Sequence, residues 1–329
     1  MAKGTNQKRK LLYLAQIFSE ETDEDHGLTL AEIAQRLSRL DINAERKTLY
    51  QDFEELRRFG MDICTNQEGK SFRYFLGSRT FQLPELKLLV DAVQSSRFIT
   101  EQKSRELIKK LETLTSRSNA SQLQRQVLIA GRIKTMNESI YYNVDGLHTA
   151  IAKERQIQFR YFRWGPDKTM ILRHNGELYT VSPWHLCWDD ENYYLVAYDS
   201  ASGRIKHYRV DKMKNITITD LPRDGAETME HLDLTVYTRR LFGMFGGEPI
   251  RVTLEGDDDM INVLIDRFGD EIPLSRKDGD RVETRVDVAV SPQFLGWVAS
   301  FGGKLTVTSP PSVKEQMRTL ARKLSEQYE

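Results

Sequence analysis

One short segment carries side chains that could read the edges of DNA bases. Hydrophobic residues at helical spacing predict a helix that buries Leu49, Phe53 and Leu56. The opposite face then presents Arg46, Lys47, Tyr50 and Gln51, with Thr48 beside them. Arginine pairs bidentately with guanine and glutamine with adenine, while lysine, threonine and tyrosine suit phosphate or thymine-methyl contacts. The chemistry of this segment is therefore that of a major-groove contact.

The elements around this segment are of the kind that position such a helix. Two amphipathic segments precede it, with apolar residues at Leu11, Leu14, Ala15 and Phe18, and at Leu30, Ile33, Ala34 and Leu37. A two-stranded pattern follows at Met61–Thr65 and Ser71–Leu76, joined by a turn over residues 66–70. We expect three helices and a hairpin in this order.

Capping residues support these helix boundaries. Thr29 and Glu32 form a capping box that opens the second helix, whose N-terminus is then a natural phosphate site. Asn43 is expected to cap the third helix, and Gly60 to end it.

This order of elements resembles a winged helix-turn-helix domain. The resemblance implies that the third helix enters a DNA major groove and that Lys70 and Arg73 of the hairpin touch the DNA backbone. Two alternatives stay open: a charged helix on a small domain that binds no nucleic acid, and a hairpin that is a plain surface turn.

The charge of the chain argues against binding by electrostatics alone. The 48 Lys and Arg residues balance the 48 Asp and Glu residues. The basic residues of the first 80 positions are nevertheless grouped, at 8–10, at 46–47, at 57–58 and at Lys70, Arg73 and Arg79. We expect binding to specific sites and modest affinity for other DNA.

Targeting signals and disulfides are not expected. No run of about 18 apolar residues occurs, and the basic N-terminus is not followed by the apolar stretch of a secretory signal. Cys64 and Cys187 lie in unrelated segments, as fits a reducing compartment. These features favour a cytoplasmic protein with no membrane contact.

Residues 81–140 read as a helical connector. Apolar residues repeat at helical spacing after Pro84, again over 100–115, and again from Leu123 to Ile129. Such helices could form a dimer interface or only a spacer, and both interpretations stay open.

From residue 141 to about 222 the sequence is rich in predicted strands. A short helix at Val144–Lys153 is followed by strands at Gln156–Arg163, Gly176–Ser182, Tyr193–Tyr198 and Arg204–Val210. Turn signals over 164–167 and 199–203 separate them. This spacing indicates a small, strongly bent sheet or partly open barrel.

Three motifs in this region resemble the WYL family. They are Val181–Leu186, Asn192–Asp199 and Arg204–Met213. The name-giving Trp-Tyr-Leu stands here as Tyr193-Tyr194-Leu195, and Lys212 replaces the usual arginine. The resemblance implies a bacterial transcriptional regulator with an Sm- or SH3-like barrel that senses nucleotides or nucleic-acid fragments.

Strand alternation suggests where a ligand would bind. On the strand 205–211, Tyr208 and Val210 share one face, so His207 and Arg209 point outward if the apolar face is the core. An anion site could then be ringed by Tyr161, Ser182, His185, Tyr194, His207, Arg209 and Lys212. Arginine would grip phosphate bidentately and aromatic rings would stack on bases. The alternative is a solvated sheet face with ordinary barrel aromatics.

The C-terminal third reads as a βαββαβα-like order of strands and helices. Strands are expected at Pro249–Leu254, Arg281–Val290 and Lys304–Thr308, and helices at Asp257–Phe268, Pro292–Phe301 and Pro311–Tyr328. In the last helix the inner positions are Val313, Met317, Leu320 and Leu324. The region resembles the extension that follows WYL domains, which implies a ferredoxin-like fold that dimerises or closes over the ligand.

No pattern for catalysis stands out. Metalloprotease, phosphate-loop, Cys-x-x-Cys and nucleophile-elbow motifs are absent from the sequence, and no histidine pair has metal-ligand spacing on one helix. We expect no enzyme, no metal and no cofactor.

The chain is therefore predicted to be a multidomain α+β protein. Its expected parts are a winged helix-turn-helix (1–80), a helical connector (81–140), the WYL barrel (141–222), a linker loop (223–248) and a ferredoxin-like extension (249–329). The predicted function is a homodimeric, ligand-responsive regulator that binds a double-stranded operator and an anionic effector. The alternative is an accessory protein whose barrel binds single-stranded nucleic acid or a phosphorylated partner.

Overall fold

The computed structural model divides the chain into two compact units, Met1–Glu138 and Ser139–Glu329. The structure describes residues 9–123, 134, 139–230, 232–277 and 279–329. Among these residues no helix is both long and apolar enough to cross a membrane. Lys8, one of the grouped basic residues, lies outside the described residues.

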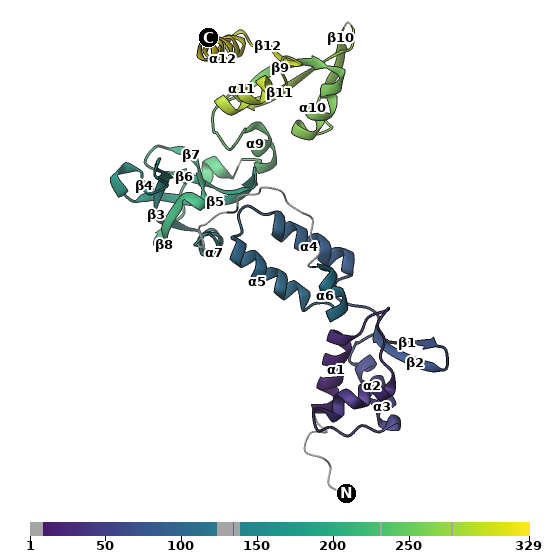
Figure 1. The fold of residues 1–329 in the computed structure, drawn as a ribbon. Coiled ribbons are helices and arrows are strands. Elements are labelled where there is room, and N and C mark those ends of the chain that lie inside the picture. Colours follow the sequence, from purple (N-terminus) through teal and green to yellow (C-terminus); the bar gives the residue numbers. More distant parts are fainter. Residues whose placement is uncertain (1–8, 124–133, 135–138, 231, 278) are drawn as a thin grey trace. The chain divides into compact units, whose positions relative to one another are not determined.

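The first unit begins with three helices and a hairpin, as predicted. These elements are α1 (Lys10–Glu21), α2 (Leu30–Ser38), α3 (Arg46–Arg58), β1 (Ile63–Glu68) and β2 (Ser71–Leu76) (Figure 1). Their common core includes Leu14, Phe18, Ile33, Leu49 and Phe53. The strands pair antiparallel up to Glu68↔Ser71, so residues 66–68 belong to β1 and not to the predicted turn.

The third helix begins later than its sequence predicts. Glu45, not Asn43, is the residue before its first turn, and it makes no side-chain cap. Ile42 is buried and Ala44 packs against the same core, which keeps the chain extended up to Glu45. Gly60 follows the helix with a φ of 104°, a left-handed conformation that glycine adopts without strain, so the predicted helix end is confirmed.

Two of the grouped basic residues, Lys10 and Arg79, make contacts inside the unit. Lys10 is only 6% exposed, and its Nζ lies 2.5 Å from Oδ2 of Asp52. Arg79 donates to the carbonyl oxygen of Thr22 at 2.6 Å, and burial lowers its pKa. The unit therefore exposes fewer basic side chains than the grouping of charges along the sequence predicts.

Three further helices complete the described part of the first unit. They are α4 (Leu83–Ser95), α5 (Glu101–Glu112) and α6 (Arg117–Leu123), with α4 and α5 side by side (Figure 1). Leu86, Val90, Ile108 and Leu123 form their small core. The helical pattern expected around residues 127–129 lies outside the described residues.

Polar contacts join α6 to the end of α1. The buried carboxylate of Asp23 accepts from the hydroxyl of Ser116 and lies 2.6 Å from Nδ1 of His26. Arg117 pairs with Glu20 at 2.6 Å. The connector is therefore packed against the helical module through charged and hydroxyl groups.

The second unit starts with a helix and a bent sheet. The elements are α7 (Ile140–Ala152), β3 (Arg155–Trp164), β4 (Met170–Leu172), β5 (Tyr179–Asp189), β6 (Asn192–Asp199), β7 (Arg204–Arg209) and β8 (Met213–Pro222). A short 3-10 turn over His174–Gly176 follows β4, and another over Val210–Lys212 links β7 to β8. The order is β4-β3-β5-β6-β7, with β8 also on β3, which makes a half-barrel. The sequence did not predict β4 or β8.

The segment expected to be a linker loop instead covers the outer face of this sheet. It contains α8 (Ala226–Met229) and α9 (Leu234–Arg240). Met229 of α8 packs with Leu241 and Met244, which follow α9. These three side chains form one buried cluster with Val196 of β6 and with Ala289 of a later strand. Residues 223–248 are therefore corrected from a loop to a packed element, because the sheet has apolar side chains on both faces.

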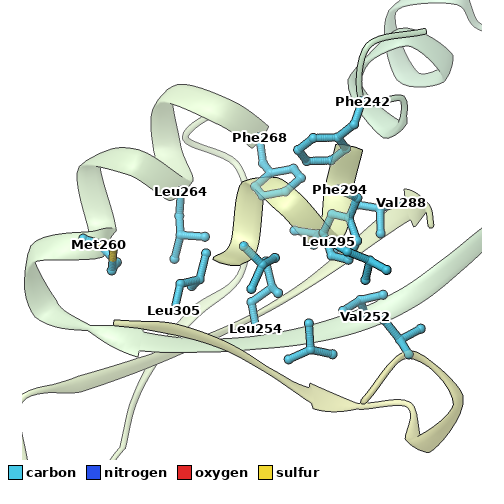
Figure 2. Close-up of a cluster of buried hydrophobic side chains, with 14 of the residues drawn as sticks. Phe242, Val252, Leu254, Met260, Leu264, Phe268, Val288, Phe294, Leu295 and Leu305 are labelled. Carbon is cyan, nitrogen blue, oxygen red and sulfur yellow. The ribbon is translucent and has the colours of Figure 1, made fainter. Parts of the chain in front are cut away.

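The C-terminal part follows the predicted order of strands and helices. Its elements are β9 (Pro249–Asp257), a 3-10 turn over Asp258–Met260, α10 (Ile261–Phe268), β10 (Leu274–Lys277), β11 (Arg281–Ala289), α11 (Pro292–Ala299), β12 (Leu305–Ser309) and α12 (Pro311–Tyr328). The strands are ordered β10-β11-β9-β12 and pair antiparallel. Figure 2 shows Phe242 entering this core beside Phe268 and Phe294.

The prediction that Leu324 is an inner residue of the last helix is wrong. Val313 is fully buried and Met317 and Leu320 pack against the core, but Leu324 is 41% exposed. All residues from 321 to 329 are exposed, so the apolar stripe continues without cover.

Replacing Lys10 by Ala is expected to destabilise the first unit by about 3 kcal/mol, because it leaves the largely buried carboxylate of Asp52 without its cation. Hydrogen exchange of the α1 and α3 amides measures this free energy of opening. Lys109→Ala, at an exposed position of α5, is the control and should change little. Equal exchange in both variants would show that the ion pair contributes nothing.

Candidate functional site

The N-terminal half of α3 presents the predicted DNA-contacting side chains to solvent. Arg46, Lys47 and Gln51 are exposed, and Tyr50 is 40% exposed. The guanidinium of Arg46 donates to the hydroxyl of Tyr50 at 3.3 Å, and the Tyr50 ring meets that of Tyr74 on β2 edge to face. These contacts connect the exposed helix face to the hairpin.

The charges of α3 differ between its two ends. Arg57 and Arg58 in the last turn pair with Glu54 and Glu55 at 2.5 and 2.7 Å. Across the part of the chain that the structure describes, no carboxylate lies within ion-pair distance of Arg46. Positive charge is therefore uncompensated only where the helix begins.

The hydroxyls of Thr29 and Thr48 are used inside the domain. Thr29 accepts from the backbone N–H of Glu32 at 3.3 Å, and its own N–H donates to the Glu32 carboxylate, so the predicted capping box is confirmed. The same backbone bond is the main cause of a lowered pKa at Glu32. Thr48 donates to the carbonyl of Glu45 at 2.8 Å. In this structure both hydroxyls serve the helix starts.

The two basic residues of the hairpin differ. Lys70 lies at the exposed turn. Arg73 donates to the carbonyl of Gly27 at 2.9 Å and also contacts the carboxylates of Glu32 and Glu68. Its guanidinium is therefore held against the start of α2, and only Lys70 extends freely from the hairpin.

In the second unit a charged centre forms around Arg209. The guanidinium donates to both carboxylate oxygens of Asp211, at 3.0 and 2.9 Å, and to Oδ1 of Asn192 at 2.7 Å. Burial works against the charge, but the hydrogen bonds and charge of Asp211 outweigh it, and the pKa of Arg209 is raised. Arg209 therefore stays cationic and fixed in direction.

Three more of the predicted ligand residues surround this centre. The hydroxyl of Tyr161 accepts from the backbone N–H of Arg209 at 3.1 Å. Nζ of Lys212 lies 3.7 Å from the Asp211 carboxylate, and burial lowers its pKa. Tyr194 lies opposite Arg209 in the β6–β7 register and is 9% exposed. The structure thus brings together Tyr161, Tyr194, Arg209 and Lys212.

His207 is not the outward-facing residue that the sequence predicted. Strand alternation placed it correctly on the face away from Tyr208, but α9 covers that face. Its Nε2 lies 3.1 Å from the hydroxyl of Tyr237, and burial lowers its pKa to about 4. A neutral, covered imidazole cannot attract an anion by charge, so its place in the anion site is corrected.

Ser182 and His185 lie elsewhere on the sheet. The hydroxyl of the buried Ser182 accepts from the backbone N–H of Asp224 at 2.9 Å. Burial, and to a lesser extent the charge of Arg223, lowers the pKa of His185. No contact in the described structure joins either residue to Arg209.

Sequence reasoning left three groups out of this site. Asp211 and Asn192 bind the Arg209 guanidinium, and Arg173 lies 5.7 Å from the Tyr161 ring. Alternation over the predicted strand 205–211 puts Asp211 on the side of Arg209, although β7 ends at Arg209 and Asp211 lies in the 3-10 turn that follows. The contact of Asn192 follows from the β6–β7 register, which the sequence did not supply. Within the described residues no cluster of three metal-ligating side chains occurs.

Comparison with known families identifies both halves of the second unit. Residues 143–218 match the WYL domain, and residues 248–325 match the WCX domain. The chain therefore contains a WYL domain, which holds the Arg209 centre, followed by a WCX domain. No curated protein matches the chain.

Solved structures with similarity to the chain include two whose matches cover most of its length. One is Proteasome accessory factor B/C (PafBC) of Arthrobacter aurescens, at 16% identity and a TM-score of 0.29; the match covers 100% of this chain and 52% of that one. The chain thus spans about half the length of PafBC. The other is a CRISPR Cas-related protein, at 14% identity and a TM-score of 0.38, covering 89% of this chain and 76% of that one.

The half-buried imidazole of His207 makes a pH-dependent contribution to stability. Because its folded pKa of about 4 lies below the ordinary 6.5, this contribution is complete above pH 6.5 and is lost as the pH falls toward 4. Relative to His207→Gln, which does not titrate, the wild type should lose about 1 to 2 kcal/mol by about pH 5. Urea unfolding followed by tryptophan fluorescence reports this unit, because all four tryptophans lie in it. A constant difference between the two proteins would contradict the assignment.

Proposed function

We propose that this chain is a ligand-responsive transcriptional regulator that binds specific double-stranded DNA. The observation that carries the proposal is the exposed, uncompensated positive charge at the start of α3. At the C-terminal end of α3, Arg57 and Arg58 are paired with carboxylates of the same helix. At its N-terminal end, Arg46 has no ion-pair partner among the described residues, so an anionic partner would bind at that end. Duplex DNA is such a partner, and the hairpin that follows α3 would contact its backbone.

In this proposal residues 1–80 are a winged helix-turn-helix. The order of three helices followed by an antiparallel hairpin supports it. Helix α3 would lie in the major groove, with Arg46 and Gln51 at base edges. Lys47 and Lys70 would contact phosphates, which set register and not sequence.

The WYL domain would bind an anionic effector of nucleotide or nucleic-acid type. Arg209 and Lys212 supply positive charge beside Asp211, and Arg173 lies over the Tyr161 ring, which supports an anion site. A ligand that binds here with preference for one arrangement of the protein would shift operator affinity.

The remaining parts of the proposal concern domain organisation. We place the connector at 81–140, the WYL region at 141–222, its cover at 223–248 and a ferredoxin-like domain at 249–329. The antiparallel strand order β10-β11-β9-β12, with helices between strands, supports that last fold. We further propose a cytoplasmic homodimer without enzymatic activity, whose two α3 helices read half-sites about 10 bp apart or a multiple of that.

Selection from sheared genomic DNA of the source organism tests the DNA-binding proposal. The purified full chain should enrich one palindromic motif, and Arg46→Ala should weaken binding to it about tenfold or more, the cost of a lost base contact. Arg58→Ala, on the same helix but paired with Glu55, is the matched control and should keep the affinity. Binding of single strands without any enriched duplex motif would instead favour the accessory-protein alternative.

Replacing Arg209 by Ala should remove the effector response and leave basal DNA affinity unchanged. The residue lies in the second unit, whereas the DNA-contacting residues lie in the first. Fluorescence anisotropy of the selected operator, with and without a panel of nucleotides, measures both quantities. A variant that fails to fold, seen as a lost thermal transition, would mean that Arg209 serves the structure and not a ligand.

A further inference from the structure

The Arg209 guanidinium already holds an anion that belongs to the protein. Nε and Nη2 each donate to one oxygen of Asp211, the paired geometry with which arginine also binds phosphate. Asn192 takes a further bond from Nη2. An incoming anion that uses the same edge of the guanidinium must therefore displace the Asp211 carboxylate.

The charges near Tyr161 are not balanced by this one carboxylate. Arg209 and Lys212 share Asp211, and Arg173 lies over the Tyr161 ring at 5.7 Å. In the described structure no ion pair is formed by Arg173. Once Asp211 is displaced, Arg209 and Lys212 present two positive charges, the complement of a doubly negative ligand.

We infer that this site, if it binds the proposed effector, selects a terminal phosphate and discriminates against a phosphodiester, with Asp211 as the residue that sets the selectivity. The inference rests on the proposed function of the WYL domain. A phosphodiester carries one negative charge, as Asp211 does. Replacing the Asp211 carboxylate by a phosphodiester therefore gives no additional binding free energy, because the carboxylate is already tethered beside the arginine. A phosphomonoester carries up to two charges near neutral pH and has three acceptor oxygens. It can engage the edge of Arg209 and the ammonium of Lys212 at the same time.

Two nucleotides that differ only in the phosphate provide the test. Isothermal titration of the full chain at about pH 7.5 compares AMP, a monoester, with 3′,5′-cyclic AMP, a diester of the same base and sugar. The wild type should bind AMP about tenfold more tightly or better. Asp211→Asn removes the internal anion, so cyclic AMP should bind more tightly than to the wild type, and the ratio should fall toward one.

Asp220→Asn is the matched control. It makes the same change of charge at an exposed position of β8, so the preference for AMP should persist in it. A general rise in positive charge would instead change both variants alike.

The possible outcomes separate this inference from the proposed function. If neither nucleotide binds the wild type at millimolar concentration, the anion site itself is wrong. If both bind equally, or if Asp211→Asn weakens both, Asp211 only positions Arg209 and the selectivity is overturned, while the anion site stands. If Asp211→Asn does not fold, the ratio measured on the wild type decides, because equal affinities alone overturn the inference.

Discussion

The second unit depends on the burial of both faces of β6. Tyr194, Leu195, Val196 and Ala197 are consecutive and all nearly inaccessible, so neither side of the strand can face water. One face is closed by the barrel interior, and the other needs a separate cover, which Met229, Leu241 and Met244 supply. At about 25 cal/mol per Å² of apolar area removed from water, such a cover is a large share of the stability of a small sheet. It also decides which polar groups of the sheet remain available: His207 lies under the cover, whereas Arg209 lies two residues further along the same face.

The two candidate sites hold their arginine cation in different ways. On α3, Arg46 stays in water and donates a hydrogen bond to the Tyr50 hydroxyl. This bond fixes the direction of the guanidinium at little electrostatic cost. At the barrel, Arg209 is partly buried, and the carboxylate of Asp211 offsets the cost of desolvating its charge. The first arrangement suits a large polyanion that reaches the surface. The second suits a small ligand, because any anion there must compete with a carboxylate that is already bound.

Sequence patterns predicted the elements better than their surroundings. Apolar spacing predicted the order of helices and strands in residues 10–76 and 249–328, because most elements there have one buried face. It missed the burial of Lys10, whose partner Asp52 lies more than 40 residues away, and the cover over His207, which comes from a later segment. Alternation along β7 assigned the right faces but could not reveal what lies against them. The bond from Arg209 to Asn192 depends on strand register, a property of the pair of strands and not of either sequence.

Neighbouring side chains between α9 and β9 enter different cores. Leu241 and Met244 close the sheet of the WYL domain, while Phe242 packs among Phe268 and Phe294 of the WCX domain. One inserted or deleted residue here would exchange these destinations and leave a large apolar side chain in the wrong place. During evolution the amino-acid types of residues 241–244 can therefore change, whereas the number of residues in this segment cannot. Insertions are instead tolerated at exposed turns such as 165–168 and 200–203, where the backbone runs over the surface.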